Sequence, residues 1–190
     1  MNPRRFYENT QGAPAMPTLL LALQHWHGAP AAALDLGCGA GRDTLELLRR
    51  GWQVTAIDAE PLAFEYLNSL VPRDHQARLQ TRCMAFQSTE LTPAELINAS
   101  FSLPFCPPGE FPALWQRIEQ ALKPCGVFAG HFFGERDSWA EDGLSIHTRS
   151  EVERLFQDWQ IIDLQEIDRQ GQTAVGKGKH WHLFAVVARR

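Results

Sequence analysis

The fold is decided by one stretch, which reads Leu34-Asp35-Leu36-Gly37-Cys38-Gly39-Ala40-Gly41-Arg42-Asp43. It ends a short apolar run, residues 31–36, that predicts a buried strand. Glycines at alternate positions after a strand let the backbone turn tightly and come close to a ligand. A helix that begins near residue 42 would direct its first N–H groups at a negatively charged group of that ligand. The stretch therefore predicts a strand, a ligand-binding turn and a helix.

Outward from this stretch, short apolar runs alternate with helical patterns along the chain. The expected strands cover residues 31–36, 53–57, part of 78–86, 96–101 and 127–133. The expected helices cover residues 42–50, a stretch from Pro61 onward, about 111–122, and a stretch capped by Ser150 with Glu153 three residues later. This alternation is typical of β-α-β units and a mostly parallel sheet.

The last part of the chain predicts a hairpin. Runs at residues 161–167 and 182–188 are joined by a stretch with Gly171, Gly176 and Gly178, which we expect to be a long hairpin loop. The final strand must then run antiparallel to its neighbours and begin at the edge where the parallel strands end. Ligands bind at that edge in open α/β sheets, so residues around His180 are expected to face the site.

Length and composition predict one ordinary domain, with a leading helix at residues 1–30 and a core at 31–190. The net charge of −4 argues against a nucleic-acid partner bound through phosphate neutralisation. Four cysteines without close pairs suit a reducing cytoplasm. The apolar run from Leu19 to Leu23 is too short to span a bilayer. We therefore expect a cytoplasmic protein with no membrane partner, and its oligomeric state stays open.

The residues around the glycine turn distinguish between possible cofactors. Asp58 lies 21 residues after Gly37, where a carboxylate can accept both ribose hydroxyls of an adenosine. A dinucleotide fingerprint would place its third glycine at position 42, where this chain has Arg42. Asp35 would repel a pyrophosphate but suits a ligand that carries an ammonium and a sulfonium. S-adenosylmethionine is favoured, and a nicotinamide-dependent oxidoreductase remains an alternative.

These residues resemble the class I S-adenosylmethionine-dependent methyltransferases over nearly the whole chain. Three blocks, residues 134–139, 147–149 and 179–182, are similar to the small bacterial tellurite-resistance and thiopurine methyltransferases. The resemblance implies a Rossmann-like, seven-stranded, mostly parallel sheet with a C-terminal antiparallel hairpin and helices on both faces. It also implies S-adenosylmethionine as cofactor, with S-adenosylhomocysteine as product, and a lid over the pocket formed by residues 1–30. The cofactor-binding residues that it implies are Asp35, Gly37, Gly39, Gly41, Asp43, Asp58, Ala59, Ala85, Phe86, Ala99 and Ser100.

Methyl transfer is an in-line displacement, so alignment in a dry pocket contributes most, and a base is needed only when the acceptor arrives protonated. The candidate catalytic residues are His131, Asp137 and His180. The candidate substrate-binding residues are Tyr7, Phe101, Phe133, Arg136, Trp139 and His182. No metal is predicted.

Each candidate also has an alternative interpretation. His131 is equally consistent with a hydrogen-bonded histidine at a strand end. Arg136 and Asp137 are also consistent with an ion pair to each other on a loop. His180 and His182 share one face of a strand. They could be core histidines, a polar clamp for an anion, or metal ligands, although the sequence fixes no third metal ligand.

The sequence thus predicts an enzyme that methylates a small molecule, a soft or anionic acceptor such as a thiol, selenium or tellurium species. Three alternatives stay open. The acceptor could be a small carboxylate or natural product, the protein could bind S-adenosylmethionine without turnover, or it could be a nicotinamide oxidoreductase. Fold-level resemblance does not choose between acceptors.

Overall fold

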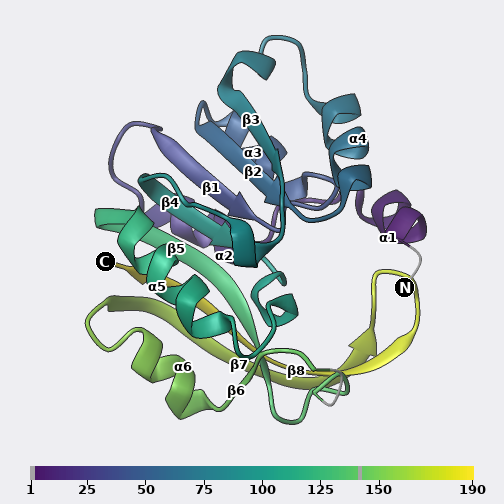
Figure 1. The fold of residues 1–190 in the computed structure, drawn as a ribbon, viewed down its shortest axis with the longest axis vertical. Coiled ribbons are helices and arrows are strands. Elements are labelled where there is room, and N and C mark those ends of the chain that lie inside the picture. The colour runs from purple at the N-terminus through teal and green to yellow at the C-terminus, as the bar shows by residue number, and fades with distance from the viewer. Residues whose placement is uncertain (1–2, 141–142) are drawn as a thin grey trace.

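A single twisted sheet forms the centre of the protein in the computed structural model, which describes residues 3–140 and 143–190 (Figure 1). Its strands run in the order β3-β2-β1-β4-β5-β8-β7, and β6 pairs with β5. Strands β1 to β5 are parallel, whereas β8 is antiparallel to both β5 and β7. The predicted Rossmann-like sheet with a C-terminal antiparallel hairpin is confirmed. The strand bounds are β1 Ala32–Leu36, β2 Gln53–Asp58, β3 Leu79–Cys83, β4 Ala94–Ala99, β5 Leu122–Gly134, β6 Ile146–His147, β7 Gln160–Gln172 and β8 Gly178–Arg189.

Helices cover both faces of this sheet. The α-helices are α1 Pro3–Thr10, α2 Pro17–His25, α3 Arg42–Arg49, α4 Pro61–Leu70, α5 Phe111–Ala121 and α6 Arg149–Leu155. Side chains of α2, α3 and α4 share one core with one face of the central strands. Side chains of α5 and α6 share a second core with the other face, built around Trp115, Phe128 and Phe156. None of the described helices is both long and apolar enough to cross a membrane.

The C-terminal hairpin differs from the prediction in the length of its loop. Strands β7 and β8 stay paired out to Gln172 and Gly178, so the connection covers only residues 173–177. The predicted long glycine-rich loop is therefore wrong. Gly171 pairs with Lys179 within β7, and glycine suits this position because an ideal Cβ would lie 2.9 Å from the ring of Trp181. The paired strands form an arm that curves towards α1 (Figure 1).

The start of α6 is also corrected. Thr148, and not Ser150, is the N-cap. Its hydroxyl accepts the N–H of Glu151, whose carboxylate accepts the N–H of Thr148 at 2.7 Å. Glu153 instead pairs with Arg149 at 2.9 Å. Both residue pairs fit the same capping-box spacing, so the sequence pattern could not decide between them.

Candidate functional site

The glycine turn lies between the end of β1 and the start of α3. Gly37, Gly39 and Gly41 all have positive φ angles, of 74°, 53° and 89°. A Cβ on Gly37 would lie 2.3 Å from the Cβ of Ser102, whose hydroxyl donates a hydrogen bond to the carbonyl of Leu36. The turn after β1 is thus packed directly against the segment that follows β4, and only glycine fits at position 37.

Two buried carboxylates lie beneath this turn. The side-chain amide of Asn98 donates to Asp35 at 2.8 Å and to Asp43 at 3.0 Å. Asp35 also accepts the hydroxyl of Thr44, and Asp43 accepts the N–H of Met16 at 2.7 Å. Within the described parts of the chain, no lysine or arginine forms an ion pair with either acid. Burial, with a further contribution from the charge of Asp43, raises the pKa of Asp35 to about 7.

This pKa shift predicts a pH-dependent stability. Because the pKa of Asp35 is higher in the folded than in the unfolded chain, the folded state binds more protons between about pH 4 and about pH 7. That contribution to the free energy of unfolding is complete below pH 4 and is lost as the pH rises through 7. We expect a loss on the order of 4 kcal/mol for the cofactor-free protein. Denaturant titrations at several pH values would measure it.

Asp35→Asn should flatten this dependence, because the amide does not titrate. Asp74→Asn is the matched control, since the Asp74 side chain is 80% exposed and should keep the wild-type slope. Equal slopes for the wild type and Asp35→Asn would contradict the assignment of the proton to Asp35.

The predicted ribose acid lies at the mouth of the glycine turn. Asp58 accepts the N–H of Gly39 at 2.9 Å and that of Glu60 at 3.0 Å, and each carboxylate oxygen can accept further bonds. The N–H of Met84 donates to the carbonyl of Asp58 at 2.9 Å, which brings the segment after β3 beside this acid. In that segment Ala85 is exposed and Phe86 is half-buried; Ala59, after β2, is also exposed. The structure thus brings together the residues predicted to hold the ribose and the adenine.

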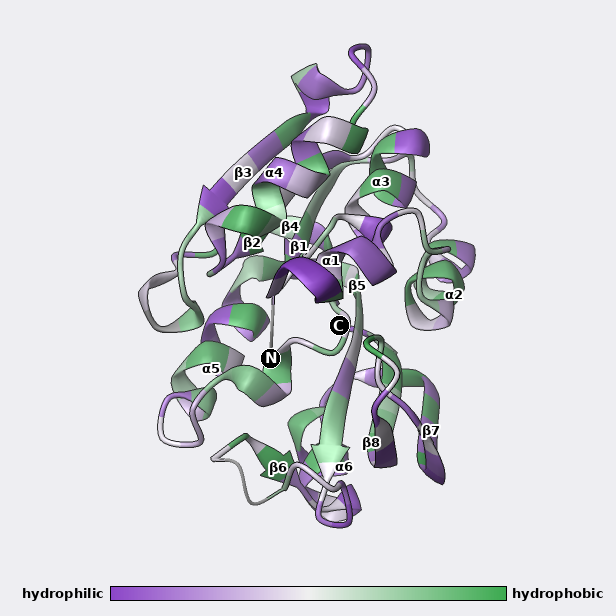
Figure 2. Ribbon diagram, turned by 90° about the vertical axis from the view of Figure 1, so that its right-hand side faces the viewer, coloured by the Kyte–Doolittle hydropathy of each residue, from purple (hydrophilic) through white to green (hydrophobic). Residues whose placement is uncertain are grey.

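Helix α1 covers the glycine turn. It is predominantly hydrophilic (Figure 2), but Tyr7 faces inward and is buried. The ring of Tyr7 would lie 3.8 Å from a Cβ on Gly39, and burial together with the charges of Asp58 and Glu60 raises the pKa of Tyr7 above its usual range. Tyr7 is therefore placed beside the predicted cofactor residues.

Three contacts hold the segment around α1. The side chain of Asn9 donates to the carbonyl of Ala174 at the tip of the arm, at 2.9 Å. The guanidinium of Arg42 donates twice to the carbonyl of Pro14, at 2.8 and 3.0 Å, and Asp43 accepts the N–H of Met16. The tip of the hairpin thus anchors the end of α1, and the start of α3 anchors the chain between α1 and α2.

Aromatic rings gather where β4 and β5 end. Phe101, two residues after β4, has a φ of 57° and stacks on His131 of β5, with ring centroids 4.1 Å apart and planes 12° from parallel. Trp181 meets Phe101 edge-on at 5.8 Å. Ala99 is buried and the Ser100 hydroxyl donates to Asn98 at 3.1 Å, which links this cluster to the buried carboxylates. Burial, with the charge of Arg42 acting in the same direction, lowers the pKa of His131 to about 3, so its ring is uncharged at neutral pH.

Asp137 and Lys179 form a buried ion pair next to these rings. The Lys179 ammonium lies 4.9, 4.0 and 4.5 Å from the ring centroids of Phe133, Trp139 and Trp181. Asp137 also accepts the N–H of Trp139 at 3.0 Å and that of His182 at 3.2 Å. These bonds commit Asp137 to holding the loop after β5 against β8. The interpretation that Arg136 pairs with Asp137 is wrong.

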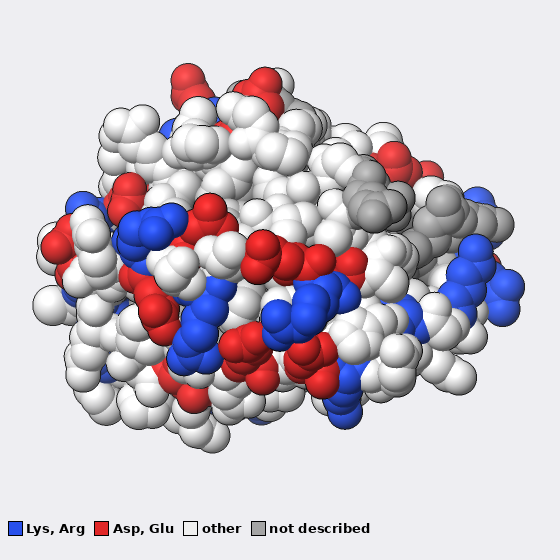
Figure 3. Space-filling view, turned by 90° about the horizontal axis from the view of Figure 1, so that it is seen from below, with Lys and Arg blue, Asp and Glu red and all other residues white. Residues whose placement is uncertain are grey.

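Arg136, His180 and His182 instead belong to a charged network on the other face of β8. Arg136 contacts Asp168 at 2.6 Å and Glu166 at 2.9 Å, while His180 and His182 contact the same two acids at 2.7 and 3.0 Å. Acidic and basic side chains alternate on this lower side of the molecule (Figure 3).

The register of β5 and β8 explains which side chains face the aromatic cluster. His131 is opposite Ala185, and Phe133 is opposite Leu183, so odd-numbered residues of β8 share the face of His131. Trp181 therefore lies on that face, whereas His180 and His182 do not. Trp181 was missed from the sequence, although the alternation of residues 180 to 182 already required it to face away from the histidines.

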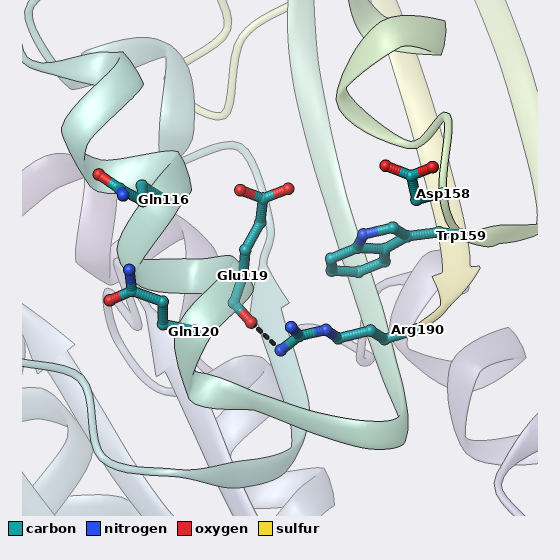
Figure 4. A pocket seen from close by; sticks show the side chains of 6 residues that line it. All are labelled: Gln116, Glu119, Gln120, Asp158, Trp159 and Arg190. Carbon is teal, nitrogen blue, oxygen red and sulfur yellow. Dashed lines mark hydrogen bonds between the residues drawn. The ribbon is translucent and has the colours of Figure 1, made fainter.

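A surface hollow of about 340 Å³ lies away from the glycine turn and the aromatic rings (Figure 4). It is lined by Gln116, Glu119, Gln120, Asp158, Trp159 and Arg190, and the carbonyl of Glu119 accepts a hydrogen bond from Arg190. This hollow lies where β5 begins and β8 ends, at the opposite edge of the sheet from the glycine turn. Ligands of open α/β sheets bind at the carboxyl edge, so we place the site at the glycine turn.

The glycine turn lies within a part of the chain that matches a known protein family. Residues 33–126, about half of the chain, match the family model described as a methyltransferase domain. These residues form a methyltransferase domain. Over 99 residues, the chain is 33% identical to the carboxy-S-adenosyl-L-methionine synthase of Geobacter sp. (strain M21), and the match covers 49% of this chain and 41% of that protein. The chain thus spans about two fifths of the length of that curated relative.

Solved structures share the fold of this chain. TehB from Haemophilus influenzae superposes with a TM-score of 0.81 at 16% identity, covering 97% of this chain and 65% of TehB. The 1,6-didemethyltoxoflavin-N1-methyltransferase of Burkholderia thailandensis, solved with S-adenosylhomocysteine, gives a TM-score of 0.71 at 24% identity, covering 95% and 80% of the two chains. These likenesses extend the shared fold beyond the matched residues 33–126 and across the C-terminal hairpin.

Proposed function

We propose that this methyltransferase binds S-adenosylmethionine along the glycine turn and transfers its methyl group to a small, soft or anionic acceptor, such as a thiol, selenium or tellurium species. The choice of cofactor rests on one observation, which is that two buried acids, Asp35 and Asp43, lie under a turn that has Asp58 at its mouth. Bound there, S-adenosylmethionine supplies an electrophilic methyl group on a positively charged sulfur.

The residues at the turn fit this cofactor. Two buried carboxylates that share one amide, with no ion-pair partner in the described chain, are stabilised by a nearby cation such as the ammonium of a methionine moiety. Asp58 is positioned to accept ribose hydroxyls, and Met84 and Phe86 offer an apolar surface for the adenine. In this proposal, residues 1–30 form a lid, with Tyr7 closing over the cofactor.

The aromatic cluster supports the choice of acceptor. A histidine whose pKa is about 3 is a weak base, so His131 cannot easily take a proton from an alcohol or an amine. The cluster therefore suits an acceptor that is already a nucleophile at neutral pH, as thiolates and reduced selenium or tellurium species are. The ring cluster at the end of β4 and β5, and the cover provided by α1, favour a small acceptor over a macromolecule.

The test is formation of S-adenosylhomocysteine from S-adenosylmethionine with a panel of tellurite, selenite, small thiols, thiopurines, carboxylates and phenols. We expect turnover with the sulfur, selenium or tellurium compounds. Turnover with carboxylates or phenols alone would overturn the acceptor class and leave the methyltransferase activity standing. Mass spectrometry of the cofactor product would also detect carboxy-S-adenosylmethionine, the product named for the Geobacter relative.

Binding measurements separate the remaining alternatives. Calorimetry should show tight binding of S-adenosylhomocysteine and no response to NADH, and Asp58→Ala should abolish that binding. Binding without turnover on any acceptor would favour a protein that binds S-adenosylmethionine without catalysing transfer. Binding of NADH would favour the oxidoreductase.

A further inference from the structure

We infer that His131 orients the acceptor as an uncharged hydrogen-bond donor through Nδ1, and that it is a positioning residue, not the base of the reaction. This inference deepens the proposed function and rests on it for the identity of the reaction. Three observations carry it: an unpartnered ring nitrogen, a strained neighbour that fixes the ring, and the charge of the surroundings.

The ring of His131 is buried, with 3% of the residue exposed, and its Nδ1 has no hydrogen-bond partner among the described residues. Most buried polar atoms in folded proteins are hydrogen-bonded, so an exception calls for an explanation. His131 lies near the carboxyl edge of β5, one residue beyond the partner of Ala99, where the sheet binds ligands. A ligand atom that completes the hydrogen bond of Nδ1 gives that explanation.

Phe101 fixes the orientation of this ring. Its φ of 57° is unusual for a bulky L-residue, and such strain clusters at binding and active sites. The strained backbone allows the ring of Phe101 to lie flat on that of His131 at 4.1 Å. Through Ser100 and Asn98, the same segment is hydrogen-bonded to Asp35 and Asp43. The His131 ring is therefore held in register with the residues proposed to bind the methyl donor.

The charges around His131 favour an anion and disfavour base catalysis. Arg42, whose positive charge acts on the ring from the start of α3, helps to keep His131 neutral, together with burial. Phe101 and Trp181 add apolar surface and no titratable group, and Asp137 is neutralised by Lys179. A neutral imidazole in this setting donates a hydrogen bond to an anionic acceptor atom across the whole physiological pH range.

The experiment uses benzenethiol as a soft anionic probe and thioanisole, its methylated and uncharged counterpart, on the full chain saturated with S-adenosylhomocysteine. His131→Phe keeps a flat ring for stacking and removes the donor. His131→Gln restores an N–H donor. His75→Phe is the matched control, because Nδ1 of His75 is also buried without a partner but lies outside the site, before β3. Affinity for S-adenosylhomocysteine, measured first, shows that each variant is folded.

We expect His131→Phe to bind the thiolate at least about tenfold more weakly than the wild type, with unchanged affinity for S-adenosylhomocysteine. His131→Gln should recover part of this loss, and thioanisole should not distinguish the variants. In nitrogen-15 spectra, the Nδ1 resonance of His131 should shift with benzenethiol and not with thioanisole. Equal thiolate affinity in His131→Phe and the wild type would overturn the inference.

If the proposed methyl transfer occurs, the pH dependence of turnover provides a second test of whether His131 is a positioning residue or a base. The pH profile of kcat/KM should follow the ionisation of the thiol itself from about pH 5.5 to about 8.5, in both the wild type and His131→Phe. A protein group that titrates in the wild-type profile and vanishes in His131→Phe would show a base and overturn the inference. If no acceptor is methylated, the proposed function fails, but the binding measurements still decide the role of His131.

Discussion

Replacing Gly37 by alanine should destabilise the protein by roughly 2–5 kcal/mol and reduce its affinity for S-adenosylhomocysteine by more than about 100-fold. The new Cβ meets two separate penalties. At a φ of 74° an L-residue is strained, by about 1–2 kcal/mol, and the Cβ would lie 2.3 Å from that of Ser102. The turn can relieve this overlap only by moving away from the segment after β4, and that movement displaces the residues proposed to bind the cofactor.

Gly176→Ala separates the two penalties. Gly176 has a φ of 80°, but no atom lies within 4 Å of an ideal Cβ there. Its substitution should therefore cost only the backbone strain and leave cofactor affinity unchanged. Denaturant unfolding and calorimetry on both variants are the measurements. If Gly37→Ala behaves like Gly176→Ala, the contact with Ser102 does not constrain the turn.

Lys179→Met should lower the free energy of unfolding by about 3–5 kcal/mol, because it leaves the buried carboxylate of Asp137 without its counter-charge. The three surrounding rings accommodate the thioether of the new methionine well. The loss of stability is therefore caused by the unpaired charge more than by a change in packing. The loop after β5 should loosen with it, since Asp137 also holds the N–H groups of Trp139 and His182.

The double variant Asp137→Asn, Lys179→Met tests this explanation, because it removes both charges and should recover much of the loss. Lys123→Met is the matched control for an exposed pair. Lys123 contacts Glu95 at 2.6 Å with 44% of its side chain exposed, and its substitution should cost less than about 1 kcal/mol. A loss for Lys179→Met no larger than that for Lys123→Met would contradict the prediction.

The cofactor half of the fold could be predicted because its signals are local. The glycines at 37, 39 and 41, and the acid that ends β2, are set by backbone conformation within one β-α-β unit, and the structure places them as expected. The start of α6 and the length of the hairpin loop could not be predicted in the same way. Two capping boxes were compatible with the sequence, and Gly171 serves a contact with Trp181 that only the strand pairing reveals.

The geometry of the proposed acceptor site depends on the pairing register of strands that lie far apart in the sequence, and the sequence pattern predicts that register poorly. The types of residue near the site were foreseen, but not their faces or partners. Asp137 pairs with Lys179, 42 residues away, and Arg136 reaches Glu166 and Asp168 across the hairpin. Trp181, which the alternation of β8 puts on the face of His131, entered only with the structure. The roles assigned to Tyr7, Phe101, Phe133 and Trp139 remain proposals for the experiments above.

The glycine turn and most of the aromatic cluster come from opposite halves of the chain, and they meet at residues 98–102. In the described part of the chain, Trp139 contacts Phe133, Trp181 and Lys179 but no residue of this shared segment, so its substitution should combine additively with those in the turn. A library randomised over the aromatic cluster alone should yield variants with different acceptors that all still bind the same methyl donor. In this fold, the acceptor can therefore change during evolution with little loss of affinity for the methyl donor, as long as Phe101 and Ser102 are kept.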